Sequence, residues 1–218
     1  MTQLIAIDGP SGSGKSTTAK LLARRLGLGY LDTGALYRAA TTEYLRRYPE
    51  GATGEQAAAL VNECRLDVGT SPEAPSFLVN GLDVTAEIRE PRISAAVSQI
   101  ATNLEVRRLL TSIMRRIIAD HGRRIVVEGR DITTVVAPDA DVRVLLVADP
   151  EARVSRRAAE VAGRASHDEV TDQVLRRDRD DSTVSNFTEA AEGVTVIDST
   201  WLSPDEVVER IVGLLPRR

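Results

Sequence analysis

Five short apolar runs lie along the chain, and each is bounded by glycine or polar residues. They occupy residues 4–8, 28–34, 124–131, 141–149 and 193–200. A short continuous run of this kind is typical of a strand that is buried on both faces, as in a parallel sheet. The pattern therefore predicts five buried strands.

The segments between these runs have helical periodicity. Apolar residues repeat at i, i+3, i+4 and i+7 from Ala19 to Leu26, and Gly27 ends that helix. A longer helix before Gly122 is marked by Val106, Leu109, Leu110, Ile113 and Ile117. Strands that alternate with helices predict an α/β fold, a doubly wound five-stranded parallel sheet with helices on both faces. In such a sheet the ligand lies beyond the carboxyl ends of the strands.

Local signals predict further helices. One is expected at about residues 34–48, and Asp149 followed by Pro150 predicts the start of another. Capping-box spacing predicts two more starts, at residues 166–169 and 203–206.

Residues 65–88 interrupt the alternation. They contain Asn80-Gly81 between apolar residues, and Asn-Gly in this setting is a strong β-hairpin signal. Short antiparallel strands do not belong in a doubly wound core, so we expect a small antiparallel β insert, with Pro91 at the start of the next helix. The expected organisation is one domain, 1–218, with its core at 1–61 and 98–218 and the insert at about 62–97.

The stretch GPSGSGKST, residues 9–17, fits the phosphate-binding template G-x-x-x-x-G-K-[ST]. It joins a predicted strand to a predicted helix, which is the context that the motif requires. The backbone N–H groups of such a loop surround the phosphates of a bound nucleotide. Lys15 would contact the β- and γ-phosphates and Ser16 would hold Mg²⁺. These features predict a P-loop NTPase.

Composition narrows the class of protein. Hydrophobic residues make up 42% and charged residues 28%, as in an ordinary globular domain. The formal net charge of -4 argues against broad nucleic-acid binding. No window approaches a membrane span, the apolar start lacks the basic segment of a signal peptide, and the single cysteine, Cys64, allows no intrachain disulfide. We therefore expect a cytoplasmic protein with no membrane or nucleic-acid partner.

The basic residues are nearly all arginines, because Lys15 and Lys20 are the only lysines. Codon bias explains such a composition, and phosphate recognition is the functional alternative, since the guanidinium group matches phosphate oxygens. Several arginines follow predicted strands or lie in late polar segments: Arg38, Arg130, Arg153, Arg156, Arg157 and Arg177. Their placement indicates more than one phosphate group to neutralise.

The acceptor itself is expected to be a phosphate. A GTPase would need an Asn-Lys-x-Asp stretch, which the chain lacks, and His121 and His167 have the setting of surface residues rather than general bases. A phosphate monoester has its second pKa at about 6, so at neutral pH it needs no base to become a nucleophile. It needs positive charge that lets two anions approach in line.

At this point the chain resembles the bacterial cytidylate kinases. The resemblance is carried, in order and spacing, by IAIDGPSGSGKST, LDTGALYR, AAVSQIATNLEVRRLL, VVEGRDITTVVAPDADV and RRDRDDS, and it covers nearly the whole chain. It implies transfer of the γ-phosphate of ATP to CMP or dCMP, with Mg²⁺, giving CDP or dCDP. It also implies a helical lid at about 153–170 that closes over ATP, and we expect a monomer.

The resemblance assigns roles to particular residues. ATP would be bound by Gly9, Pro10, Ser11, Gly12, Ser13, Gly14, Lys15, Ser16 and Thr17, with Arg153 and Arg156 of the lid, and Ser16 would be the metal ligand. The acceptor nucleotide and its phosphate would lie near Thr33, Arg38 and Arg130, and its cytosine near Ser98, Arg107 and Asp131. Arg177 and Asp181 would lie near the pentose and the transferring phosphate, and the catalytic set would be Lys15, Arg130, Arg177 and Asp181.

Three positions depart from the family pattern. Glu128 stands where the family usually has aspartate, and Thr133-Thr134 stand where it usually has Gly-Thr. Val184 stands where an arginine is common. Either another arginine such as Arg179 replaces that contact, or acceptor binding is weaker.

Two alternatives remain open from the sequence. One is another small P-loop kinase that phosphorylates a hydroxyl, on shikimate or a coenzyme A precursor, with Asp32 as its base. The large insert argues against it. The other is a nucleotide-binding regulator without turnover, against which the intact Lys15–Ser16 pair argues.

Overall fold

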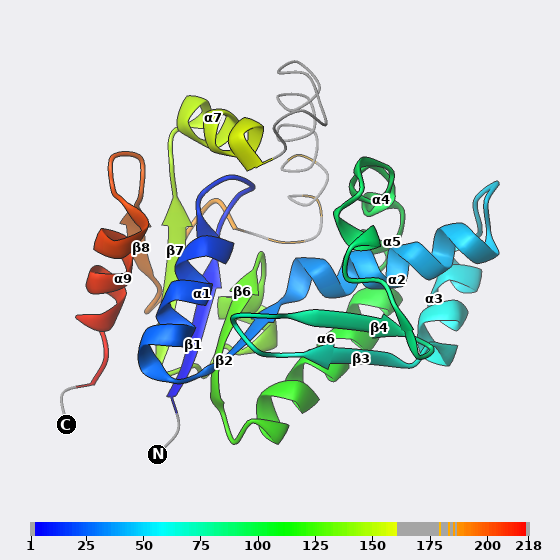
Figure 1. Cartoon of the computed structure of the whole chain (residues 1–218), viewed down its shortest axis with the longest axis horizontal. Helices are drawn as coiled ribbons and strands as arrows, with labels where there is room; N and C mark the ends of the chain where they lie inside the picture. Colours follow the sequence, from blue (N-terminus) through cyan, green and yellow to red (C-terminus); the bar gives the residue numbers. More distant parts are fainter. Residues whose placement is uncertain (1–2, 161–178, 180–182, 184, 186, 217–218) are drawn as a thin grey trace.

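The computed structural model describes residues 3–160, 179, 183, 185 and 187–216. Its centre is a five-stranded sheet in the order β2-β6-β1-β7-β8, and every neighbouring pair is parallel (Figure 1). The strands are β1 (Gln3–Asp8), β2 (Gly29–Asp32), β6 (Arg124–Gly129), β7 (Val142–Val147) and β8 (Thr195–Asp198). The five predicted strands and their parallel arrangement are confirmed.

Both faces of this sheet are covered, as the alternation of side chains along β1 shows. Ile5 and Ile7 belong to one buried cluster, with α1 (Lys15–Leu26) and α9 (Pro204–Val212). Leu4 and Ala6 point to the opposite face and a second cluster. That cluster includes residues of α2 (Thr33–Arg47), α3 (Gly54–Glu63) and α6 (Leu104–Asp120). Because consecutive side chains of a strand alternate, one apolar run supplies both cores.

The predicted β insert is present as a separate three-stranded antiparallel sheet. It consists of β3 (Leu66–Gly69), β4 (Ser76–Val79) and β5 (Leu82–Asp83). Asn80 and Gly81 form its turn with φ of 53° and 83°, as a two-residue hairpin requires. Three short helices follow: η1 (Glu87–Arg89), α4 (Pro91–Ala96) and α5 (Ser98–Ala101).

The insert shares the core of the main domain. Phe77, Val79 and Ile88 are buried in the cluster that also holds α2 and α6. Figure 1 shows the insert lying along α2 on one side of the parallel sheet. The insert is therefore packed on the main domain, and its boundaries at 62 and 97 stay a prediction.

Other local predictions have mixed outcomes. The capping box of Ser203 and Glu206 at α9 is confirmed, and α7 (Pro150–Glu160) begins at the expected proline. Helix α3 was not predicted, nor was η2 (Ile132–Val136), a π-helical turn after β6. The predicted start at 166–169 lies outside the described residues.

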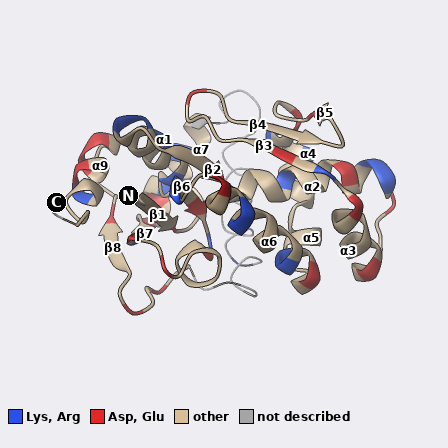
Figure 2. Cartoon of the chain, turned by 90° about the horizontal axis from the view of Figure 1, so that it is seen from below, with Lys and Arg blue, Asp and Glu red and all other residues tan. Residues whose placement is uncertain are grey.

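Among the described residues, no helix is long and apolar enough to cross a membrane. Acidic and basic segments lie side by side on the outer helices α2, α3 and α9 (Figure 2).

Candidate active site

The phosphate-binding loop connects the central strand β1 to α1. Its conformation depends on glycine, because Gly9, Gly12 and Gly14 have φ of 152°, 76° and 89°. A Cβ on Gly12 would also collide with the carbonyl oxygen of Arg153, so the loop packs directly on the backbone of α7. The Lys15 Nζ atom donates to the carbonyl oxygen of Pro10 at 2.8 Å.

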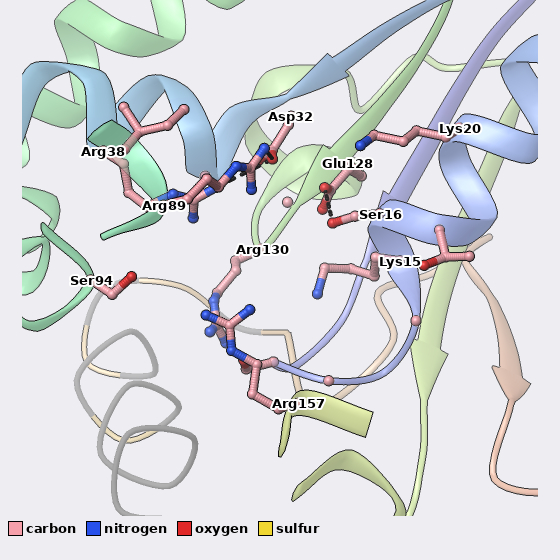
Figure 3. Close-up of a pocket in the computed structure, with 17 residues that line it drawn as sticks. Lys15, Ser16, Lys20, Asp32, Arg38, Arg89, Ser94, Glu128, Arg130 and Arg157 are labelled. Atoms are coloured by element: carbon pink, nitrogen blue, oxygen red, sulfur yellow. Dashed lines mark hydrogen bonds and ion pairs between the residues drawn. The ribbon is translucent and has the colours of Figure 1, made fainter. Parts of the chain in front are cut away.

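A cavity of about 370 Å³ lies in front of this loop, at the carboxyl ends of β1, β2 and β6. Figure 3 shows Lys15 and Ser16 on one side of it and Arg38, Arg89, Arg130 and Arg157 around the other. The lining residues are Ser11, Gly12, Gly14, Lys15, Ser16, Thr17, Lys20, Asp32, Gly34, Arg38, Ile88, Arg89, Ser94, Glu128, Gly129, Arg130 and Arg157. The cavity therefore offers two groups of anion-binding side chains, with the loop on one side and the arginines on the other.

The arginines are contributed by separate elements and are fixed by different contacts. Arg38 on α2 and Arg89 on η1 both contact Oδ2 of Asp32, at 3.3 and 3.4 Å. Arg130 follows β6, and its guanidinium group lies 4.4 Å from the ring centre of Phe187, which is buried. These contacts hold the cationic groups before any phosphate arrives.

Asp32 is buried among cations. Burial alone would raise the pKa of its carboxyl, but Arg38, Arg89 and the backbone N–H of Ala35 outweigh burial and lower it. Burial lowers the pKa of Arg38, although Asp32 opposes this change. Asp32 also caps α2, because it accepts from Ala35 N at 2.7 Å. It is thus a charged structural partner, which does not fit the role of a base for a hydroxyl acceptor.

Ser16, the predicted metal ligand, donates its hydroxyl hydrogen to Glu128 Oε1 at 2.6 Å. Tyr30 donates to the same oxygen at 3.2 Å. Burial and the charge of Asp32 raise the pKa of Glu128, and burial raises the pKa of Tyr30 well above its ordinary value. The Ser16 hydroxyl and the Glu128 carboxyl group line the same cavity and are hard oxygen donors of the kind that Mg²⁺ prefers, so the residues present fit this ion.

Arg107 and Asp131, predicted to face the base, form an ion pair in which each side chain is only 13% exposed. Arg107 also lies over the ring of Tyr37, 5.8 Å from its centre. Asp8 anchors the turn behind Asp131, since its carboxylate accepts from the backbone N–H groups of Ile132 and Thr133 at 2.8 Å. Burial raises the pKa of Asp8, against the effect of these hydrogen bonds.

Arg153 and Arg156, predicted to contact ATP, instead bind backbone and hydroxyl groups in this structure. Arg153 Nη1 donates to the Ser11 carbonyl at 3.1 Å, and Arg156 donates to the Ser199 and Thr200 carbonyls. Both arginines therefore tie α7 to the phosphate loop and the segment after β8. Their contact with ATP stays a prediction.

The structure brings together only part of the predicted site. Ser11, Gly12, Gly14, Lys15, Ser16, Thr17, Arg38 and Arg130 line the cavity, whereas Gly9, Pro10, Ser13, Thr33, Ser98, Arg107, Asp131, Arg153 and Arg156 do not. Thr33 is near, because its hydroxyl donates to the Glu128 carbonyl at 2.9 Å. Arg177 and Asp181 lie outside the described residues, as do Val184 and residues 161–170 of the expected lid.

Several lining residues were not assigned to the site from the sequence: Lys20, Arg89, Ser94 and Glu128. Arg157 was among the arginines expected to neutralise phosphate, although no particular contact was assigned to it. Arg89 lies in the insert, and only the packing of the insert on α2 brings it to the cavity. His121 was interpreted as a surface residue, but its Nε2 atom lies 2.6 Å from the Thr70 hydroxyl and it is partly buried. It does not line the cavity.

A glycine-rich phosphate loop at the end of a central parallel strand, faced by arginines across one cavity, defines a P-loop kinase. The protein-family model described as cytidylate kinase matches residues 5–217. The chain belongs to the cytidylate kinase family, and so is an ATP-dependent nucleoside monophosphate kinase.

Individual relatives agree with this assignment. A cytidylate kinase of Cutibacterium acnes is 53% identical, over 98% of this chain and 96% of its own length. One of Nocardia farcinica is 45% identical, over 95% and 91%. Among solved structures, an uncharacterized protein of Eubacterium ventriosum is similar over the full length of both chains, with a TM-score of 0.54 and 12% identity. That likeness concerns the fold alone.

Proposed function

We propose that this chain transfers the γ-phosphate of ATP to CMP or dCMP, with Mg²⁺, in the cavity between the phosphate loop and the arginines. The observation that carries the proposal is the placement of Arg38, Arg89, Arg130 and Arg157 opposite Lys15 (Figure 3). A kinase whose hydroxyl acceptor is uncharged needs one cationic site, for the donor phosphates. A second cationic group fits an acceptor that carries its own phosphate.

This acceptor also explains how the reaction proceeds without a general base. At neutral pH a phosphate monoester is largely a dianion and already a nucleophile. The main barrier is repulsion between two anions, which Lys15 and the arginines lower by stabilising charge on both phosphates. The acceptor phosphate would lie against Arg38, Arg89 and Arg130, and the donor phosphates against the loop.

Mg²⁺ would be held by Ser16, with Glu128 beside it. When bound, the ion neutralises charge on the β- and γ-phosphates of the nucleotide. Glu128 accepts the Ser16 hydroxyl hydrogen, which leaves the Ser16 oxygen lone pairs free for a cation.

The cytosine would be recognised by Arg107 and Asp131. Asp131 directly follows Arg130, which lines the cavity, so the pair lies next to the expected acceptor phosphate site. A carboxylate accepts from the amino group of cytosine, and a guanidinium donates to its ring acceptors. Ser98, Arg177 and Asp181 keep the roles that the resemblance implies as predictions.

A coupled assay of ADP release across CMP, dCMP, UMP, AMP and shikimate tests the proposal. CMP and dCMP are expected to give the highest kcat/KM, and omission of Mg²⁺ should abolish turnover. Preference for shikimate would refute a phosphate acceptor. Preference for UMP or AMP would refute the role given to the Arg107–Asp131 pair while leaving the phosphate acceptor intact.

We further propose that the protein acts as a monomer in the cytoplasm. Light scattering during gel filtration should give the monomer mass of 23.6 kDa with and without nucleotides. A dimer mass would refute the monomer.

A further inference from the structure

Tyr30 is a buried tyrosine whose hydroxyl contacts a residue that lines the site. The residue is 1% exposed, and its ring packs in the cluster between the sheet and α1. Lys20 Nζ lies 5.5 Å from the centre of the ring, and the hydroxyl donates to Glu128 Oε1 at 3.2 Å. The ring is therefore fixed by packing, while its one polar atom is directed to a residue that lines the cavity.

The strand register makes this contact a diagonal one. In the parallel pairing of β2 with β6, Tyr30 pairs with Val126 and Asp32 pairs with Glu128. Tyr30 and Glu128 are thus two residues out of register on the same face, a separation that only long side chains bridge. Glutamate has one methylene more than the aspartate usual in the family at this position, and this extra length favours the contact.

Two hydroxyl groups converge on a single carboxylate oxygen. Ser16 and Tyr30 both donate to Oε1 of Glu128. The terminal torsion of a glutamate is broad and is poorly fixed by rotamer preference alone. The second hydrogen bond, from a ring that cannot move, restricts that torsion.

We propose that Tyr30 is a positioning residue for the magnesium–nucleotide complex, because its hydroxyl holds Glu128 where it accepts the Ser16 hydroxyl hydrogen. Ser16 then keeps its lone pairs available for the metal. This inference rests on the proposed function, specifically on Mg²⁺ at Ser16. It predicts that Tyr30 contributes to metal-dependent nucleotide binding and contributes little to nucleotide binding without metal.

The test uses Tyr30→Phe, which keeps the ring, its packing and the neighbouring Lys20. Tyr44→Phe is the matched control, since Tyr44 is also buried, its hydroxyl accepts from Ala52 N at 3.0 Å, and it does not line the cavity. Calorimetry measures the Kd of a β,γ-imido analogue of ATP in EDTA and in saturating Mg²⁺. The readout is the ratio of these two Kd values, which needs no catalytic turnover.

In Tyr30→Phe, the gain in affinity due to Mg²⁺ should fall by about three- to tenfold, the effect of losing one hydrogen bond of ordinary strength. The Kd in EDTA should match that of wild type, and Tyr44→Phe should match wild type under both conditions. An unchanged ratio in Tyr30→Phe would overturn the inference. That outcome includes equal weakening of nucleotide binding in EDTA and in Mg²⁺, which would indicate a purely structural role.

Failure of the proposed function gives a different result. Wild-type protein would then bind the analogue equally well with and without Mg²⁺, or would not bind it. A thermal melt of each variant, without ligand, checks that both phenylalanine proteins are folded. If Tyr30→Phe melts well below Tyr44→Phe while its ratio stays at the wild-type value, the hydroxyl serves stability alone and the inference is wrong.

Discussion

At the scale of single residues, the carboxylate of Asp131 distinguishes base recognition from simple ion pairing. Asp131 pairs with Arg107, and both side chains are largely buried. Such a pair can serve the structure alone, or it can present donor and acceptor atoms to a base. Cytosine offers an amino donor where uracil has a carbonyl oxygen, and a carboxylate binds the first and repels the second.

The first prediction follows from that difference. If Asp131 accepts from the base, Asp131→Ala should lower kcat/KM for CMP far more than for UMP. The ratio of kcat/KM for CMP to that for UMP should fall by about tenfold to a hundredfold. This is the difference between a buried polar group that has a hydrogen-bond partner and one that has none. The measurement is kcat/KM for both nucleotides in wild type and variant.

Asp139→Ala is the control, since Asp139 also pairs with an arginine, Arg123, but is 70% exposed and does not line the active-site cavity. It should leave the ratio unchanged. If Asp131→Ala also leaves the ratio unchanged, Asp131 serves only as the ion-pair partner of Arg107.

At the scale of elements, Asp32 at the start of α2 both caps this helix and supplies a buried negative charge. Asp32 ends β2, caps α2 and faces Arg38 and Arg89. Asparagine would keep the cap, because it is as good a capping residue as aspartate. Asp32→Asn therefore removes the charge alone and leaves Arg38 buried with less compensation.

The second prediction is that Asp32→Asn lowers the free energy of unfolding by roughly 3 kcal/mol in phosphate-free buffer at neutral pH, as for a broken buried pair. The pKa of Asp32 is lowered in the folded state, so its contribution is present above the unfolded pKa of about 3.9 and is lost as pH falls through the folded pKa. Urea unfolding from pH 8 to pH 3 should show a constant difference from wild type above about pH 5, which shrinks below about pH 4.

Glu209→Gln is the control, because the pair of Glu209 with Arg25 is exposed on both sides and should contribute little at any pH. A difference for Asp32→Asn that grows as pH falls would contradict the sign of the pKa shift. A difference like that of the control would mean that solvent already screens Asp32.

The sequence predicts a structural element when the residues that determine it are close together in the chain. The strands, the phosphate loop and the Asn80-Gly81 hairpin follow from neighbouring residues, and all were predicted. Helix α3 has an equally local signal, the capping box of Thr53 and Gln56, which was overlooked.

Other features depend on contacts between distant segments. The turn η2 is held by Asp8, which is 124 residues away from Ile132, and Tyr30 meets Glu128 only through the strand register. Arg89 reaches the cavity only because the insert packs on α2. No local pattern in one sequence encodes such contacts, so the sequence predicted the phosphate loop with Arg38, Arg130 and Arg157 but missed Arg89 and the contacts of Glu128.

At the scale of the whole molecule, three parts of the chain line one cavity. The phosphate loop belongs to the main domain, Ile88, Arg89 and Ser94 belong to the insert, and Arg157 belongs to α7. Two bound nucleotides would bridge these parts. Since water would otherwise accept the transferred phosphate, we expect the parts to draw together when both nucleotides are present.

The last prediction tests this closure with trypsin, which cleaves after arginine. Arg89 lines the cavity with its side chain 44% exposed, and Arg65 lies at the edge of the insert with its side chain 78% exposed. CMP with the imido analogue of ATP should slow cleavage at Arg89 by more than the product of their separate effects, because closure needs both ligands. Cleavage at Arg65 should change little, which makes it a control within the same molecule. Mass spectrometry of the early fragments gives both rates. If the slowing at Arg89 with both ligands equals the product of the slowing with each ligand alone, each ligand only shields its own contacts. Equal slowing at both arginines would indicate general stabilisation instead of closure.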